Sequence, residues 1–200
     1  MSLSTCIVCG SPRKTNHSIK LALALKRALH QKTNQEPALV DFRDYDIPLM
    51  AQGSLNPTQL SPFQQHLFDS MSKADLVILI SPEYNWMPSA EMINFIHQMA
   101  DKPYASMWDG KVFGVCGVSN GRGGRFPVVQ LSYVLNKILG FMGFDSFVSP
   151  RGLELQFIHQ TLGPEGEVLN NPEFEKGMDA FLIQALRYAD TWKSGRLQRA

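Results

Sequence analysis

The stretch from Thr5 to Lys32 reads TCIVC-GSPRKTNH-SIKLALALKRALHQK, and it decides the fold. Its first five residues form a beta-rich apolar run with little polar alternation, which is typical of a strand that is covered on both faces. After a loop rich in hydroxyl and amide side chains, apolar residues recur at helical spacing from Ser18 onward, with cations toward the end. The stretch therefore predicts a buried strand, a polar loop and a helix.

The same alternation of strand and helix continues along the chain. Further beta-rich runs predict strands at Ala38–Phe42, Leu76–Ile80, Val112–Val118 and Ser146–Ser149. Apolar residues at helical spacing predict helices over Thr58–Lys73, Ala90–Ala100, Val128–Met142 and about Glu173–Lys193. Right-handed crossovers then give an α/β fold with a five-stranded parallel sheet and helices on both faces. Five strands suit the doubly wound, flavodoxin-like order 2-1-3-4-5 better than a barrel, which needs eight.

The composition favours one globular domain over residues 1–200. Because 19 Lys and Arg balance 18 Asp and Glu, the chain has no long-range attraction to nucleic acid or to an anionic membrane. The longest aliphatic runs are far too short to span a bilayer, and no apolar segment of a signal peptide follows Met1. We therefore expect a cytoplasmic protein that acts on a small molecule, without nucleic-acid or membrane partners.

The three cysteines do not form a disulfide framework. Cys6 and Cys9 make a C-x-x-C pattern, which could indicate a thioredoxin-like redox pair. They lie within a predicted strand, however, where residues three apart point to opposite faces. We interpret them as buried structural thiols in a reducing compartment.

The first candidate site is the loop Gly10–Ser18, between the first strand and the first helix. The start of a helix offers unpaired backbone N–H groups and the positive end of the dipole, so an anion is favoured there. The loop lacks both the G-x-G-x-x-G spacing of a dinucleotide turn and the pattern of a P-loop. Its hydroxyl-rich composition therefore favours a terminal monophosphate, with an ordinary helix cap as the alternative. The side chains that could bind the anion are those of Ser11, Arg13, Lys14, Thr15, Asn16 and Ser18.

The second candidate is the loop Ser81–Ser89, which follows the third predicted strand. Two prolines, two aromatic residues and an amide in this position predict a stiff surface that suits a planar heterocycle. In the alternative interpretation, the aromatic side chains only close the end of the sheet.

The third candidate is the glycine-rich loop Gly117–Arg125, where the backbone can approach a ligand closely. It also contains G-x-S-x-G around Ser119, as in the nucleophile elbow of a serine hydrolase. Asp145 and His159 follow in the chain order that a hydrolase triad would need. That hydrolase is a remote alternative, because it leaves the other two loops without a role.

No metal site is expected, because the five histidines show no ligand spacing and no Cys/His/carboxylate cluster occurs. His97, in the helix after the second candidate loop, is interpreted as a packed or solvated residue and not as a catalytic acid.

Together the three loops resemble those of the NAD(P)H-dependent FMN reductase family of flavodoxin-like proteins, which includes azo-dye, quinone and chromate reductases. The family's G-S-x-R motif after the first strand matches Gly10–Arg13, and its more specific P-E-Y-N motif is present as Pro82–Asn85. Asn94 resembles an asparagine of the family's next helix, and Gly121–Gly124 resembles its glycine-rich loop. The likeness covers roughly residues 5–145.

The resemblance implies an enzyme that binds FMN and transfers hydride from NADPH or NADH to a small acceptor. The acceptor would be a flavin, a quinone, an azo compound or a metal oxyanion, and no catalytic side chain is required, because the flavin performs the chemistry. The resemblance also implies a homodimer or homotetramer. It implies that the FMN phosphate is bound by Ser11, Arg13, Asn16 and Ser18. The ribityl chain and the isoalloxazine ring would be lined by Pro82, Glu83, Tyr84 and Asn85. The opposite side of the site would be formed by Ser119, Gly121, Gly123 and Gly124.

Arg122 and Arg125 are candidates for binding the phosphates of the pyridine nucleotide, with solvated loop charges as an equal alternative. The chain departs from the family pattern after P-E-Y-N, where the proline comes one residue early at Pro88, Ile93 replaces a lysine and His97 replaces an aspartate. These departures indicate altered helix contacts or subunit packing more than altered FMN binding. Two alternative functions share the fold: a flavodoxin-type electron carrier, which the net charge of +1 disfavours, and a non-catalytic flavin-binding module.

Overall fold

The computed structural model describes residues 2–197, and its centre is a parallel sheet. The strands β1 (Thr5–Cys9), β2 (Ala38–Asp41), β3 (Leu76–Pro82), β4 (Val112–Val118) and β5 (Phe147–Val148) are arranged in the order β2-β1-β3-β4-β5. Every pair in this sheet is parallel, as crossover helices require. The predicted flavodoxin-like order is therefore confirmed.

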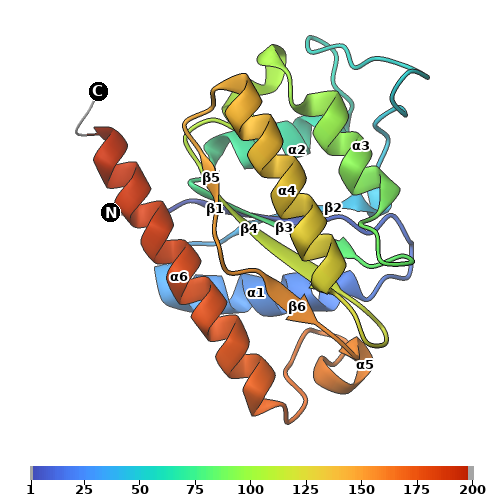
Figure 1. The fold of residues 1–200 in the computed structure, drawn as a ribbon, viewed down its shortest axis with the longest axis vertical. Helices are drawn as coiled ribbons and strands as arrows, with labels where there is room; N and C mark the ends of the chain where they lie inside the picture. Colours follow the sequence, from blue (N-terminus) through green and yellow to red (C-terminus); the bar gives the residue numbers. More distant parts are fainter. Residues whose placement is uncertain (1, 198–200) are drawn as a thin grey trace.

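Helices cover both faces of the sheet (Figure 1). One face packs against α1 (Ser18–Thr33) and α6 (Pro172–Leu197), and the other packs against α2 (Pro62–Lys73), α3 (Ala90–Met99) and α4 (Arg125–Met142). The two layers bury separate sets of apolar side chains, and β1, β3 and β4 contribute to both. None of the helices within residues 2–197 combines the length and the apolar character that crossing a bilayer requires.

The cysteines of β1 follow the predicted alternation. Cys6 packs in the α2–α4 layer and Cys9 in the layer of α1 and α6, so their thiols lie on opposite faces of the sheet. Burial raises the pKa of each to about 12, which keeps both thiols neutral near pH 7. The interpretation as structural thiols is confirmed.

The starts of α2 and α4 and the end of β2 differ from the sequence-based prediction. α2 begins at Pro62 and not at Thr58, because Ser61 and Gln64 form a capping box directly before it. β2 ends at Asp41, whose side chain accepts a hydrogen bond from Arg43 N and starts a short 3-10 turn, Phe42–Asp44. α4 begins at Arg125, three residues earlier than predicted, so that Arg125 belongs to the helix and not to the glycine-rich loop.

The predicted fifth strand is shorter than expected, and a sixth strand was missed. β5 pairs with the first residues of β4, and β6 (Leu153–Leu155) pairs with its last residues, from Cys116 to Val118. A short helix, α5 (Ile158–Thr161), follows β6. A three-residue strand is too short to produce a pattern in the sequence. It nevertheless matters for function, because β6 and α5 border the loop that follows β4.

Candidate functional site

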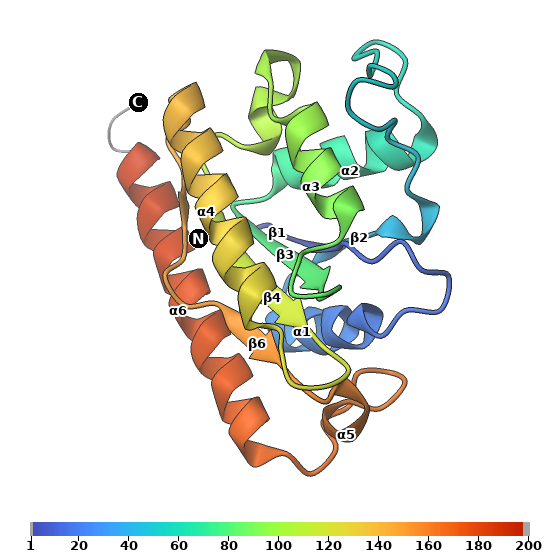
Figure 2. The same ribbon diagram turned by 45° about the vertical axis from the view of Figure 1, so that its right-hand side comes forward.

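The three loops singled out in the sequence come together at the C-terminal edge of the sheet. In Figure 2 the segments that follow β1, β3 and β4 gather at this edge, next to α5. They enclose an open pocket of about 390 Å³. A pocket of this size accommodates a cofactor-sized molecule, and the C-terminal edge is where doubly wound sheets bind ligands.

The loop after β1 is folded around Asn16. Its side-chain Oδ1 accepts a hydrogen bond from Ile19 N at 2.8 Å, and its Nδ2 donates to Arg13 O at 3.2 Å. Ser11 and Ser18 line the pocket and are almost fully buried, with 1% and 2% of their surface exposed. Because the first turn of α1 contains no acidic residue, this corner is suited to an anion.

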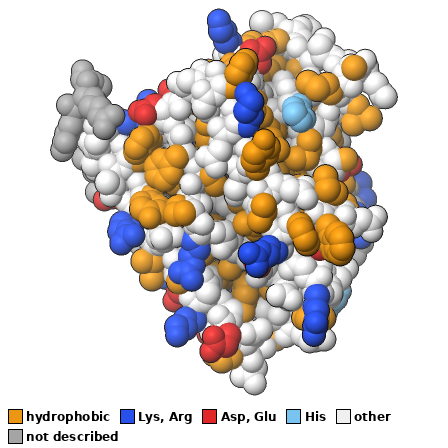
Figure 3. All heavy atoms as spheres, viewed as in Figure 1, with side chains coloured by type: hydrophobic (Ala, Val, Ile, Leu, Met, Phe, Trp, Pro, Cys, Tyr) orange, Lys and Arg blue, Asp and Glu red, His pale blue; other side chains and the backbone are white. Residues whose placement is uncertain are grey.

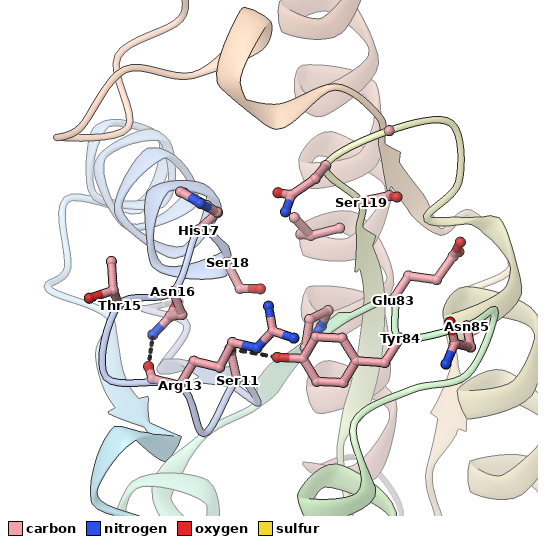
Figure 4. A pocket seen from close by; sticks show the side chains of 14 residues that line it. Ser11, Arg13, Thr15, Asn16, His17, Ser18, Glu83, Tyr84, Asn85 and Ser119 are labelled. Carbon is pink, nitrogen blue, oxygen red and sulfur yellow. Dashed lines mark hydrogen bonds between the residues drawn. The ribbon is translucent and has the colours of Figure 1, made fainter.

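Arg13 and Tyr84 connect the first loop to the loop after β3. The guanidinium carbon of Arg13 lies 4.4 Å from the centre of the Tyr84 ring, and the hydroxyl oxygens of Ser11 and Tyr84 are 3.4 Å apart. Figure 4 shows the side chains of Arg13 and Tyr84 next to each other, with Asn16 and Ser18 close by. Arg13 is therefore held beside the buried serines, where its charge favours a phosphate.

The loop after β3 turns back through Asn85 and Trp86. Tyr84 N donates to Met87 O at 2.9 Å and Met87 N donates to Tyr84 O at 3.0 Å, which closes a two-residue turn. Asn85 and Trp86 both have positive φ, 51° and 68°, as a type I′ turn requires. This conformation suits asparagine but is strained for tryptophan, so the turn places Trp86 outward at a cost in backbone energy.

The stiff surface expected in this loop is present in part. Tyr84 and Asn85 line the pocket, whereas Trp86 does not and is 66% exposed. The Trp86 ring stacks on Phe126 of α4, with ring centres 5.3 Å apart, and its carbonyl accepts a hydrogen bond from Gln130 Nε2 at 3.0 Å. The exposed aromatic pair thus fastens the turn to α4.

The glycine-rich loop folds back tightly onto β4. A methyl group on Gly117 would overlap the carbonyl of Gly124, and Gly124 itself has a φ of +89°. Both positions therefore require glycine. Of the residues assigned to this part of the site, Ser119 and Gly121 line the pocket, whereas Gly123 and Gly124 do not. Gly124 N is already hydrogen-bonded to Glu83 Oε2, at 2.6 Å.

Two histidine rings meet beside the pocket, and the sequence singled out neither as a contact of a cofactor, because His159 was named only as the base of the serine hydrolase alternative. His17 lines the pocket, and its ring lies edge-on to that of His159 in α5, with 4.0 Å between centres. Burial, and then the charges of His159, Lys20 and Arg13, lower the pKa of His17, so its ring is neutral near pH 7. The sequence did not indicate that these two rings are in contact, because α5 was not expected.

The serine hydrolase alternative has no triad in the structure. Asp145 precedes β5 at the N-terminal edge of the sheet, where its backbone N donates to Asp109 Oδ1 at 2.6 Å. Ser119 follows β4 at the opposite edge. A seven-residue strand separates the two edges by roughly 20 Å, too far for a shared proton relay.

Asn94, likened above to an asparagine of the family, lies outside the pocket. Its Oδ1 accepts from Met50 N at 2.9 Å, and its Nδ2 donates to Tyr45 Oη and Pro48 O. It therefore fastens the segment after β2 to α3. Within residues 2–197, no group of three or more His, Cys, Asp or Glu side chains is placed to hold a metal ion.

The fold and the pocket define the class of flavodoxin-like proteins, which bind a ligand at the C-terminal edge of a five-stranded sheet. More specifically, the sequence model described as NADPH-dependent FMN reductase matches residues 4–151. The chain belongs to this family, and it is accordingly an NAD(P)H-dependent flavin oxidoreductase with FMN as its cofactor. Among curated proteins, no sequence matches the chain.

Solved structures with low sequence identity share the fold. FerB from Paracoccus denitrificans, a flavoenzyme NAD(P)H:(acceptor) oxidoreductase, is 20% identical, with a TM-score of 0.69 over 92% of this chain and 98% of its own. A flavodoxin from the domain Archaea is 11% identical, with a TM-score of 0.57 and the same coverage of both chains. An azoreductase from Bacillus anthracis is 15% identical, with a TM-score of 0.52 over 96% of this chain and 99% of its own. At these identities the likeness establishes the fold alone.

The donor groups of the pocket fit FMN. Ser11 and Ser18 present buried hydroxyls beside the Arg13 cation, which is the donor set that a phosphate monoester needs. Tyr84 and Asn85, from the loop after β3, and Ser119 and Gly121, from the loop after β4, line the rest of the pocket. The pocket thus has an anion-binding end and a less charged end.

Proposed function

We propose that this pocket binds FMN with its phosphate at the N-terminus of α1. Ser11, Arg13, Asn16 and Ser18 would hold the phosphate, with Asn16 acting mainly through the fold of its loop. Pro82, Glu83, Tyr84 and Asn85 would line one side of the ribityl chain and ring, and Ser119 and Gly121 the other, with Gly123 and Gly124 shaping the loop that presents them. The observation that carries this assignment is the pair of buried serine hydroxyls beside Arg13 at a helix start without an acidic residue.

The protein's own task in the reaction is to bind and orient. FMN, when bound, supplies the chemistry by taking up hydride from a nicotinamide and passing it on. We assign Arg122 and Arg125 to the phosphates of NADPH or NADH, because both are exposed, Arg122 in the glycine-rich loop next to Gly121 of the pocket and Arg125 at the start of α4. The acceptor is a small molecule, namely a flavin, a quinone, an azo compound or a metal oxyanion.

The experiment that tests this function is a visible absorption spectrum of the purified protein, followed by anaerobic addition of NADPH. A yellow protein that bleaches supports the reductase. A yellow protein that does not bleach favours an electron carrier or a non-catalytic flavin-binding module. A colourless protein that also fails to take up added FMN contradicts the assignment.

We also propose that the chain forms a homodimer or homotetramer in the cytoplasm. The outer side of α4 and the adjoining turn expose large apolar side chains, and Figure 3 shows such side chains over α4. A second copy would cover this surface, whose members are Trp86, Met87, Phe126, Val129 and Tyr133. Light scattering should give a multiple of 22.4 kDa for the wild type and a smaller particle for Val129→Asp. A monomeric wild type would contradict this proposal. The buried free cysteines are compatible with a reducing compartment.

A further inference from the structure

Among the helices that begin at the edge of the sheet that holds the pocket, α1 and α4 differ in what meets their N-termini. Neither α1 nor α4 has an acidic residue in its first turn. Gly124, which caps α4, nevertheless donates its backbone N–H to Glu83 Oε2 at 2.6 Å. In the described part of the chain, the first turn of α1 receives an amide oxygen, from Asn16, and no carboxylate. Since a helix N-terminus attracts anions, α1 stays open to one and α4 does not.

The Glu83 carboxylate is fixed in this position from several sides. Its backbone N donates to Val118 O at 2.8 Å, which ties the residue to the end of β4. A methyl group on Gly123 would overlap Glu83 Oε1, so the carboxylate packs directly against the glycine backbone. Figure 4 shows the side chain turned toward the glycine-rich loop and away from Arg13 and Ser18. Two positive-φ glycines, Gly123 and Gly124, make room for a carboxylate that comes from another loop.

We propose that Glu83 is a positioning residue, whose carboxylate occupies the N-terminus of α4 as a built-in anion and so directs the phosphate of the cofactor to α1. This inference rests on the FMN placement proposed above. Without the carboxylate, one pocket would offer two helix N-termini to a ligand with a single dianionic end. With it, an anion is repelled from the α4 side and attracted by Arg13 on the α1 side. The charge of Glu83 thus determines which way round the cofactor lies.

The test compares Glu83→Gln with the wild type in the binding of riboflavin, which lacks the phosphate. The glutamine keeps an oxygen that can accept the hydrogen bond from Gly124 N but removes the charge. Glu91→Gln is the matched control, because Glu91 lies in the first turn of α3 and does not line the pocket. Quenching of riboflavin fluorescence gives the Kd of each apoprotein, with inorganic phosphate replacing chloride at constant ionic strength.

In the wild type and in Glu91→Gln, phosphate should leave the Kd of riboflavin unchanged, because it binds at α1, where riboflavin has no group. In Glu83→Gln, phosphate should raise the Kd of riboflavin by about fivefold or more, because an anion at the N-terminus of α4 obstructs the flavin. An equal effect, or none, in both proteins would overturn the inference. A wild type that binds neither FMN nor riboflavin would instead contradict the proposed cofactor site.

A second measurement, on apoprotein that keeps Glu83, tests the inference even if Glu83→Gln fails to fold. Calorimetric titration of the wild-type apoprotein with inorganic phosphate should show one site, and Arg13→Ala should abolish it. A phosphate site that persists in Arg13→Ala would place an anion away from α1. That outcome would overturn the inference without any variant of Glu83.

Discussion

The two ends of β4 use their polar groups in opposite ways. At the start of the strand, Lys111 is 3% exposed, and its ammonium donates to Ser72 O at 3.0 Å and Ala74 O at 2.8 Å. Its backbone N donates to Ser146 Oγ at 2.7 Å. At the other end of the strand, Ser119 lines the pocket. The first end joins elements of the fold to one another, and the second faces space for a ligand.

The polar residues at the two ends of β1 and β3 differ in the same way. Asp75, before β3, accepts hydrogen bonds from Lys193 Nζ and Ser4 N, each at 2.8 Å. The hydroxyl of Ser11, beyond β1, has within residues 2–197 only a long contact to Tyr84 Oη, although Ser11 is 1% exposed. A buried polar group normally has a strong partner within the protein. Where the partner is weak and a pocket adjoins, binding of a ligand is the better explanation. Sequence alone does not separate the two ends, because both contain charged and hydroxyl residues next to buried strands.

The largest expected effect concerns the glycine-rich loop. Gly117→Ala should lower the free energy of unfolding by about 2–3 kcal/mol, because its methyl group would overlap the carbonyl of Gly124 and force the loop off β4. Gly121→Ala is the control, since its methyl group would meet no atom within 4 Å, and it should change stability by less than about 0.5 kcal/mol. Urea unfolding of the apoproteins measures both. Equal effects would show that the tight fold of the loop does not contribute to stability.

The next largest effect tests whether Arg13 lies at the end of the pocket that binds the phosphate. Arg13→Ala should raise the Kd of FMN about 10- to 30-fold, the effect of removing one charge-assisted hydrogen bond to phosphate. Lys14→Ala removes the same charge from the same loop, but Lys14 Nζ donates to Arg43 O at 2.7 Å outside the pocket, so FMN should bind as before. Riboflavin should bind both variants equally well. A similar loss for both ligands would place Arg13 near the ring and not near the phosphate.

At the opposite end of the sheet, Lys111 should make stability depend on pH. Burial lowers its pKa from 10.5 to about 8. Above pH 10.5 the amine is neutral in both states, and as the pH falls toward 8 the unfolded chain takes up the proton first. The free energy of unfolding should therefore rise by on the order of 2 kcal/mol as the pH increases from 8 to 10.5, and it should fall by the same amount as the pH decreases over this range.

Denaturant titrations at several pH values test this dependence, with Lys111→Met as the comparison. The variant should lose the part of the pH dependence that lies between pH 8 and 10.5. The neutral amine still has two N–H groups for the two carbonyls that it contacts, so the folded state can keep both hydrogen bonds. Identical pH profiles for wild type and variant would show that Lys111 does not titrate in this range.

The sheet could be predicted from the sequence because its strands are continuous apolar runs, such as Leu76–Ile80. Strand order followed from general rules on crossovers. The last part of the sheet could not be predicted, because β6 has three residues and its position depends on pairing with Cys116–Val118. α5 and the contact between His17 and His159 depend in turn on β6. Local pattern predicts long elements, whereas short ones are determined by tertiary contacts.

For the site, the sequence indicated the right loops but not the roles of single residues. Tyr84 and Asn85 line the pocket as expected, but the positive φ of Trp86 turns that side chain outward. Glu83 lines the pocket, and its carboxylate also accepts a hydrogen bond from Gly124 N, 41 residues later in the chain and directly before α4. This hydrogen bond joins two loops that are far apart in the sequence, and the sequence does not show that they are in contact. It depends on the direction of each side chain, which motifs do not encode.

The smallest expected effect concerns the rim of the site. Arg122→Ala combined with Arg125→Ala should raise the KM for NADPH about three- to tenfold and leave the Kd of FMN unchanged, because exposed cations contribute modestly to binding. The effect should be larger for NADPH than for NADH, which has one phosphate fewer, and it should shrink as salt increases. Lys137→Ala combined with Arg187→Ala removes the same charge from exposed positions on α4 and α6 and should leave KM unchanged. If both double variants raise KM equally, only the overall charge of the protein attracts the nucleotide. If neither does, Arg122 and Arg125 are solvated charges, and the functional end of the sheet is confined to the pocket itself.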